Sequence, residues 1–354
     1  MRTTIARLVA LGLVLSACSV AATEPLDSTT STNPAPTTTS STSTTSTTTL
    51  DQSENSLING LPVDDPALLD RRVLAVKVDN HPRAIPQSGI DQADMVIEMI
   101  VEGITRFITL WHESDVDYLG PNRSGRPTDA SLLAALNEPT FTISGAQAWV
   151  QNVILGKDIN LIKELSEGTF RISGRRAPHN LYVDTFALRE TADAREYANE
   201  PPDAPLWSFG PMSDLAVTAS SVTIDFSGNV VVWTWDEAQG LWLRTAYGSD
   251  AMHRDEEGSE GRIGVPVLIA LYTERYTASP PSGQSGTNLP SSRTTGSGKA
   301  YVFADGKVTE GTWERETETE WFHLTDGNGE VIMVPPGKSW VSLVPASSGL
   351  TISE

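Results

Sequence analysis

The amino-acid sequence predicts an N-terminal α/β domain with a mixed sheet over residues 58–200, followed by a smaller, mostly antiparallel all-β domain over residues 201–354. Three observations favour this fold class. The first part alternates β-branched runs with segments of helical periodicity, the second is a series of short alternating strands, and a Pro-rich segment from Asn199 to Pro205 separates them.

Residues 1–17 have the pattern of a secretion signal. Arg2 and Arg7 form a basic start, and the apolar run from Leu8 to Leu15 is too short to cross a bilayer of about 30 Å as a helix. The tetrapeptide ending at Cys18 resembles a bacterial lipobox, which predicts cleavage before Cys18 and attachment of acyl chains such as palmitate to its thiol. The alternative is an ordinary signal peptide with an incidental cysteine.

Residues 18–57 are expected to form a tether, because a segment of Ser, Thr and Pro cannot bury enough apolar surface to offset the entropy of ordering it. Lipidated Cys18 and this tether predict an extracytoplasmic protein anchored by lipid to the outer face of the cytoplasmic membrane. Cys18 is the only cysteine, which excludes an internal disulfide and a cysteine-rich metal site. The formal net charge of −20 argues against nucleic acid as a partner.

In the first domain, residues 93–103 fit both helical and strand periodicity. We favour a strand, since Gly103 then closes a turn into the next β-prone run, and Glu98 and Glu102 project from one face. The other strands are expected at 73–79, 105–113 and 139–145, and helices at 127–136, 146–156, 161–168 and 185–197.

The second domain is expected to consist of strands joined by tight turns. Asp305-Gly306, Asp326-Gly327 and Asn328-Gly329 are hairpin signals. The strands are expected at 222–226, 230–236, 241–247, 265–274, 298–307, 311–316, 320–326, 330–334 and 339–344, with a Ser/Gly/Pro-rich loop from 279 to 297. The tryptophans of this domain fit core packing, and a carbohydrate-stacking face is the alternative.

Most of the unusual chemistry lies in two polar segments, from Asp79 to Arg106 and from Arg175 to Asn180. Guanidinium groups on loops next to Gly and Pro indicate a site for a carboxylate or phosphate, which Arg binds through paired hydrogen bonds. The alternative is that these arginines pair internally with acidic residues. The ligand-binding candidates are Asp79, Asn80, His81, Gln87, Arg106, Arg123, Arg126, Arg175, Arg176, His179 and Asn180.

Acid–base catalysis is a second interpretation of the same segments. Glu98 and Glu102 on one face, with His81 and His179 nearby, could perform such steps if their pKa values differ. No metal or cofactor is predicted, because zinc and EF-hand motifs are absent and the GSGKA segment lacks the spacing of a phosphate loop. The sequence motifs of catalytic serine and cysteine nucleophiles are absent as well.

The segments DNHP, PQSG, QADMVIE, EGITRF, GPNRSGR and RRAPHN, in this order, resemble the N-terminal domain of the YerB-like bacterial lipoproteins, a family named as of unknown function. WLRTAYGSDAMHRD, GSGKAYVFADGKVTEGTW and PPGKSWVSLVP resemble its C-terminal domain. The resemblance implies a two-domain, membrane-anchored, extracytoplasmic protein and supplies no reaction. The Ser/Gly/Pro-rich loop departs from the pattern by its length.

Taken together, the sequence favours a lipid-anchored protein that binds an anionic or glycan-linked ligand of the cell envelope, with a cell-wall polymer or cell-wall protein as partner. Two alternatives remain open. One is an envelope hydrolase or transferase that uses a Glu/His acid–base pair, and the other is a non-catalytic scaffold for cell-wall enzymes.

The predicted anchor can be tested by replacing Cys18 with Ser. Without the thiol no acyl chain can be attached, so the protein should move from the membrane fraction to the medium. Fractionation of cells that express each form measures this shift, and retention of the variant in the membrane would contradict the lipid anchor.

Overall fold

The computed structural model describes residues 55–164 and 166–354, so the predicted signal peptide, Cys18 and nearly all of the tether lie outside the described residues. The α-helices of the described residues are short and all lie before residue 195: α1 (Pro127–Leu133), α2 (Ala148–Leu155) and α3 (Thr185–Ala194). Single 3₁₀ turns are η2 (Pro66–Asp70), η3 (Pro82–Ala84), η4 (Ile90–Gln92) and η5 (Ala134–Leu136). No helix in the described ranges is long and apolar enough to cross a membrane.

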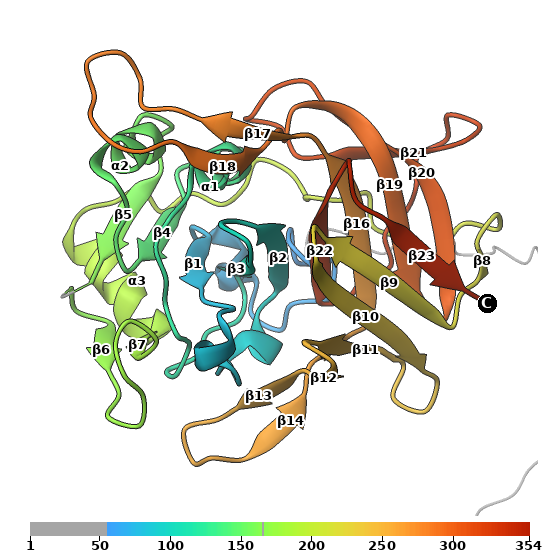
Figure 1. Cartoon of the computed structure of the whole chain (residues 1–354), viewed down its shortest axis with the longest axis horizontal. Coiled ribbons are helices and arrows are strands. Elements are labelled where there is room, and N and C mark those ends of the chain that lie inside the picture. Colours follow the sequence, from blue (N-terminus) through green and yellow to red (C-terminus); the bar gives the residue numbers. More distant parts are fainter. Residues whose placement is uncertain (1–54, 165) are drawn as a thin grey trace, which may run out of the picture. The chain divides into compact units, whose positions relative to one another are not determined.

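An eleven-stranded mixed sheet forms the centre of the fold (Figure 1). Its order is β21 (His323–Asp326), β20 (Lys307–Arg315), β19 (Gly296–Ala304), β16 (Val267–Thr273), β22 (Ser339–Pro345), β2 (Met95–Ile100), β3 (Thr105–Trp111), β1 (Leu74–Val78), β4 (Thr140–Ile143) and β5 (Asn160–Lys163), and β8 (Val217–Thr218) pairs with β20. The two halves of the chain meet where β22 lies between β16 and β2, parallel to both.

A second, antiparallel sheet packs against one face of the main sheet. Its order is β12 (Ser249–Asp250), β11 (Leu241–Ala246), β10 (Asn229–Asp236), β9 (Ser221–Phe226) and β23 (Leu350–Ser353), and β15 (Gly264–Val265) pairs with β11. The remaining strands form two-stranded pairs: β6 (Thr169–Arg171) with β7 (Leu181–Val183), β13 (Met252–Arg254) with β14 (Glu260–Arg262), and β17 (Arg275–Ala278) with β18 (Leu289–Ser292).

The predicted fold class is correct in part. A mixed sheet is present and the second half is built from strands, but helices are few and strands from both halves share one sheet. The predicted helix at 161–168 is wrong, because Leu161 and Ile162 are buried in β5, which extends the sheet parallel to β4. The predicted strand at 330–334 is also wrong: Val331 and Val334 make isolated bridges only. The strand interpretation of residues 95–100 is confirmed by β2.

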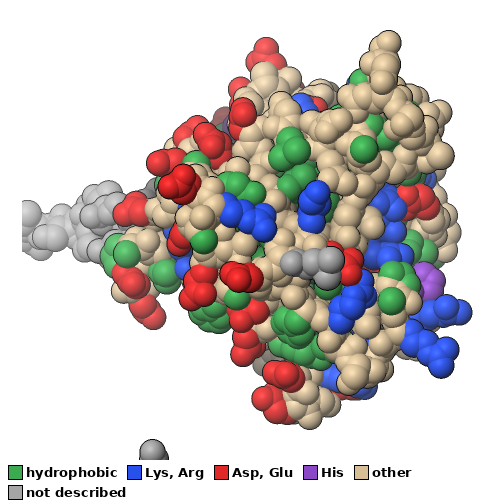
Figure 2. Space-filling model, turned by 90° about the vertical axis from the view of Figure 1, so that its left-hand side faces the viewer, with side chains coloured by type: hydrophobic (Ala, Val, Ile, Leu, Met, Phe, Trp, Pro, Cys, Tyr) green, Lys and Arg blue, Asp and Glu red, His purple; other side chains and the backbone are tan. Residues whose placement is uncertain are grey.

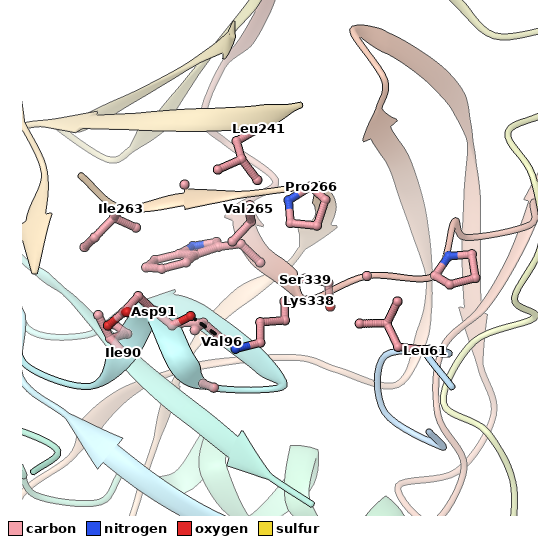
Figure 3. Close-up of a pocket in the computed structure, with 15 residues that line it drawn as sticks. Leu61, Ile90, Asp91, Val96, Leu241, Ile263, Val265, Pro266, Lys338 and Ser339 are labelled. Atoms are coloured by element: carbon pink, nitrogen blue, oxygen red, sulfur yellow. Dashed lines mark hydrogen bonds between the residues drawn. The ribbon is translucent and has the colours of Figure 1, made fainter. Parts of the chain in front are cut away.

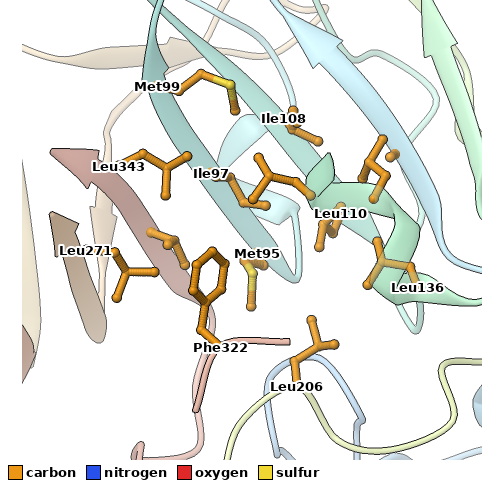
Figure 4. Packing of buried hydrophobic residues seen from close by; sticks show 14 of the residues in the cluster. Met95, Ile97, Met99, Ile108, Leu110, Leu136, Leu206, Leu271, Phe322 and Leu343 are labelled. Carbon is orange, nitrogen blue, oxygen red and sulfur yellow. The ribbon is translucent and has the colours of Figure 1, made fainter. Parts of the chain in front are cut away.

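The main sheet is buried on both faces, and β2 shows how its side chains divide. Met95, Ile97 and Met99 point into the core beside α1, and Figure 4 shows them packed with Ile108 and Leu110 of β3. Val96 and Ile100 point the opposite way, into the core beneath the second sheet. This alternation follows from the two-residue repeat of a strand.

The tryptophans pack inside the protein. Trp233, Trp242 and Trp340 are almost fully buried in the core between the two sheets, with edge contacts such as Trp233–Trp340 at 5.2 Å between ring centroids. None of the nine tryptophans, all of which lie within the described ranges, is exposed. Core packing is therefore the role of these residues, and the structure offers no exposed tryptophan face for carbohydrate.

A buried ion pair joins the two sheets inside this core. Arg244 of β11 donates from Nη2 to Oε1 of Glu98 on β2 at 2.7 Å, and both side chains are at most 2% exposed. Trp340 Nε1 donates to the other carboxylate oxygen at 3.0 Å. The guanidinium also lies 5.2–5.9 Å from the ring centroids of Phe107, Trp233 and Trp340, so aromatic faces stabilise its charge where water does not reach.

We expect Glu98→Gln to lower the free energy of unfolding by about 3–5 kcal/mol, because it leaves the Arg244 charge buried without its partner. Removing both charges in Glu98→Gln/Arg244→Met should cost less than Glu98→Gln alone. Urea unfolding measures each value. Glu310→Gln, which breaks the exposed Lys299–Glu310 pair, is the matched control and should change little; an equal loss in the control and in Glu98→Gln would contradict the role of the buried pair.

Candidate functional site

The loop after β1 begins with a buried carboxylate. The Asp79 N–H donates to the Pro121 carbonyl at 2.9 Å, which holds this residue beside the segment from Gly120 to Arg126. Asp79 Oδ1 accepts from the His81 N–H at 3.0 Å, and His81 Nδ1 in turn accepts from the Arg83 N–H at 3.1 Å as the cap of η3. The Asp79 side chain is fully buried, so its direction is fixed by these contacts.

His179 reaches the same carboxylate from the second polar segment. Its Nδ1 lies 2.7 Å from Asp79 Oδ2, and its ring stacks on His81 with centroids 4.6 Å apart. A neutral His179 therefore donates from Nδ1 and leaves Nε2 as the free acceptor. Burial and the neighbouring His179 ring lower the pKa of His81, while the negative charge of Asp79 acts in the opposite direction.

Three arginines gather beside this pair. Arg123 Nε lies 3.3 Å from Asp79 Oδ2, Arg126 Nε donates to Glu102 Oε1 at 2.6 Å, and Arg106 Nη2 lies 3.8 Å from Glu102 Oε2. Burial, followed by the charge of Arg126, lowers the pKa of Arg106 to about 10. We name Arg106, Arg123, Arg126, His81 and His179 the basic cluster.

Two atoms of the basic cluster lack hydrogen-bond partners. Arg106 Nε and Arg123 Nε are buried, and neither donates to any acceptor among the described residues. The contact of Arg123 with Asp79 is thus an ion pair without hydrogen-bond geometry. Because a buried N–H without a partner is costly, an acceptor supplied by a ligand would stabilise this arrangement.

A second ion pair supports the cluster from below. Lys77 of β1 donates to Asp129 Oδ1 at 2.6 Å, and both side chains are fully buried. Burial lowers the pKa of Lys77 to about 8. Asp129 Oδ2 also accepts from the Arg126 N–H at 2.7 Å, which fixes Arg126 at the start of α1. Lys77 and Asp129 are not among the residues predicted from sequence, although a lysine within the apolar run of β1 indicates a buried acidic partner.

Other predicted site residues shape the loop. Arg175 donates to the carbonyls of Ala84 and Pro86. Gln87 Nε2 donates to the Asp79 carbonyl at 3.1 Å and to Asn80 Oδ1 at 3.0 Å. These bonds hold the loop in one conformation. The side chains of Arg175 and Gln87 are thus used within the loop and do not extend the basic cluster.

Arg176 and Asn180 of the second segment lie apart from the cluster. Asn180 Nδ2 donates to the Ile172 carbonyl at 3.2 Å within the β6–β7 hairpin. The Arg176 side chain is exposed. The structure therefore brings together Asp79, His81, Arg106, Arg123, Arg126 and His179, and it leaves Arg176 and Asn180 outside this group.

Glu98 and Glu102, expected to share one face, lie in different surroundings. Glu98 is fully buried and accepts from Arg244, Trp340 and Thr105 Oγ1, the last at 2.7 Å. Glu102 follows the end of β2 and is 39% exposed. Burial raises the pKa of Glu102, but the hydrogen bond and charge of Arg126 outweigh it, so that the pKa lies below its ordinary value. The two carboxylates therefore take different partners, Glu98 in the core between the sheets and Glu102 beside Arg126.

Charge is unevenly distributed over the surface that Figure 2 shows, on the side of the molecule where β5, β6 and β7 lie. Lys and Arg side chains and a histidine gather toward one edge, whereas Asp and Glu gather toward the other. In a chain of formal net charge −20, such a basic edge is where an anion would be attracted. Within the ranges that the structure describes, no group of three His, Cys, Asp or Glu is placed to hold a metal ion.

Comparison with known proteins points to one family. Residues 58–198 match the N-terminal domain, and residues 222–341 the C-terminal domain, of a protein of unknown function, DUF3048. The chain is 25% identical over 296 residues to YerB of Bacillus subtilis strain 168, which is named as a candidate lipoprotein; the match covers 80% of this chain and 85% of YerB. The crystal structure of B. subtilis YerB shares the fold, with a TM-score of 0.71 at 22% identity, over 84% of this chain and 99% of that chain.

The stacked histidines make a prediction about the pKa of His81. His179→Asn removes the neighbouring ring that lowers the pKa of His81 and should therefore raise this pKa, whereas Asp79→Asn removes a negative charge and should lower it. Chemical shifts of the His81 ring, followed by NMR as a function of pH, measure both. If neither variant moves the titration, the two rings do not stack next to Asp79 in solution.

Proposed function

Because the chain belongs to the YerB-like family, whose N- and C-terminal domains are both of unknown function, we propose that it is a lipid-anchored extracytoplasmic protein that binds an anionic cell-envelope ligand at the basic cluster. The ligand group would be a carboxylate or a phosphate, carried by a wall polymer or a glycan-linked molecule. The proposal combines the site geometry with the lipobox pattern at Cys18.

The observation that carries the proposal is the pair of buried, unpartnered Nε atoms of Arg106 and Arg123. A guanidinium presents its N–H groups in a planar fork that matches two oxygens of a carboxylate or phosphate. The three arginines of the cluster contact only two carboxylates, those of Asp79 and Glu102. An anion would add the missing acceptors and balance the remaining positive charge.

The fixed loop supports binding as well. Arg175 and Gln87 hold the loop from Asp79 to Gln87 through backbone carbonyls, and Asp129 fixes the backbone of Arg126. A ligand that enters this site meets side chains whose supporting backbone is already placed. Little conformational entropy would then be lost on binding.

The anchor is supported by two separate lines. The segment that ends at Cys18 resembles a lipobox, and the relative YerB is named as a candidate lipoprotein. Cys18 lies outside the described residues, so the Cys18→Ser fractionation experiment is the direct test of this part of the proposal.

A second candidate function is a hydrolase or transferase of envelope polymers, favoured by one contact. Asp79 Oδ2 at 2.7 Å from His179 Nδ1 orients the imidazole so that Nε2 can accept a proton. In this candidate function His179 is the base. Glu98 is not, because its carboxylate is paired with Arg244. Turnover of a wall polymer that is lost in His179→Asn, while binding persists, would support catalysis over binding alone.

The binding function is tested with Arg123→Ala, because Arg123 is partly exposed, at 21%, and its loss should leave the fold intact. We expect the affinity for inorganic phosphate, a poly(glycerol phosphate) or a muropeptide to fall about 10- to 100-fold, which corresponds to a charge-assisted hydrogen bond. Isothermal titration calorimetry measures the affinity of each probe for the wild type and the variant.

The matched control is Arg171→Ala, since Arg171 is an exposed arginine paired with Glu164 away from the cluster. It should bind each probe as the wild type does. Equal affinity of Arg123→Ala and the wild type, or equal losses in Arg123→Ala and Arg171→Ala, would overturn the assignment of the ligand to the basic cluster.

A further inference from the structure

A cavity of about 440 Å³ lies on the opposite side of β2 from α1, away from the basic cluster. It opens where β2 and β22 begin, and the strands β11 and β15 of the second sheet form its other wall (Figure 3). Its volume is in the range of pockets that hold small organic ligands. None of the basic-cluster residues lines it.

The cavity walls are apolar and well buried. In Figure 3, Ile263 and Val265 lie on one side and Ile90 and Val96 on the other. These four side chains are between 2% and 8% exposed, although they face an open space. Trp340 also lines the cavity and is held in place by its bond to Glu98. Removing an apolar group from water into such walls is favourable.

Two adjacent polar residues stand at the beginning of β22. Lys338 Nζ donates to the Gln92 carbonyl at 2.9 Å, but no carboxylate of the described residues lies within ion-pair distance of it. Ser339 is 2% exposed, and its Oγ has no hydrogen-bond partner among the described residues. Asp91 lines the cavity too, and its carboxylate lies 3.1 Å from His253 Nδ1. Asp91 Oδ1 is buried without a hydrogen-bond partner among the described residues, so the mouth holds one carboxylate beside His253, and a cation and a hydroxyl that bond no carboxylate.

We propose that this cavity binds a small amphiphile with an apolar body and one anionic head group, such as a medium-chain carboxylate. The apolar body occupies the space between Val96, Val265 and Trp340. The head group takes a charge-assisted hydrogen bond from Lys338 and a second bond from Ser339 Oγ. An apolar body alone would leave Ser339 Oγ without a partner and the Lys338 charge without an anion, and a cationic head would be repelled by Lys338.

The binding of this amphiphile is separate from the anion site proposed above. It uses different residues, a different face of β2 and a largely apolar surface. The amphiphile could come from membrane lipid or from a free fatty acid, since both present the same chemistry to the cavity. Comparing binding of the free acid in solution with transfer from anionic vesicles distinguishes the two sources.

The test uses the full-length chain with Cys18→Ser, so that no acyl chain of its own competes. Titration calorimetry should show that decanoate binds at least about tenfold more tightly than decanol, because only decanoate pairs with Lys338. Lys338→Met should lower decanoate affinity to that of decanol. Lys307→Met, an exposed lysine on β20, is the matched control and should leave both affinities unchanged.

A second test of the proposal uses variants that fill the cavity. Val265→Phe on β15 and Ala93→Leu on the opposite wall each occupy part of the space and should weaken both ligands at least about tenfold. Urea unfolding checks that each variant is folded, and the two changes lie on different walls, so failure of one to fold leaves the other. Failure of the wild type to bind decanoate at millimolar concentration, or unchanged binding by a folded cavity-filling variant, would overturn the proposal. Either result leaves the phosphate binding of the basic cluster unaffected.

Discussion

The buried pair of Glu98 and Arg244 is the interaction on which the rest of the structure depends. The two residues are 146 positions apart, and Trp340, which donates to the same carboxylate, is 242 positions from Glu98. A charged pair inside an apolar core is costly unless its surroundings stabilise both charges, and here Thr105 and Trp340 donate to Glu98 while three aromatic rings face Arg244. The first strand pair, the second sheet and the late strand β22 must therefore all be in place together. This condition makes one cooperative unit out of two sequence domains.

The candidate site is connected to this pair by a line of hydrogen bonds. Thr105 donates to Glu98, Asn80 Nδ2 donates to Thr105 Oγ1 at 2.7 Å, and Asn80 is the neighbour of Asp79 in the chain. Tyr247 of the second sheet also donates to the Asn80 carbonyl at 2.8 Å. The loop that carries Asp79 and His81 is thus fixed from both halves of the chain. Residues outside the basic cluster therefore help to place Asp79, which His179 contacts.

Local patterns in the sequence were sufficient for much of this description. The strand choice for residues 95–100 followed from alternation, and the segments around Asp79 and His179 were recognised as polar residues among turn formers. The meeting of these two segments across 100 residues follows from no local rule, yet the resemblance of both to one family, which the comparisons confirm, placed them together. What local patterns could not give is pairing at a distance. Glu98 is a candidate for acid–base catalysis in the sequence, because no residue near it in the chain indicates its contact with Arg244. Residues 161–163 fit a helical pattern, although they pair with β4.

The position of β22 in the sheet has a consequence for how the protein is made. This strand, Ser339–Pro345, lies between β2 and β16 in the middle of the sheet, yet it is synthesised after every other strand of this sheet. Until it arrives, β2 and β16 each present an unpaired edge, and such edges invite pairing with other chains. A chain synthesised from its N-terminus therefore stays in an open form until residues 339–345 emerge. Chaperones or proteases that recognise unpaired strand edges would act on that open form, and a chain cut short before β22 could not close its sheet.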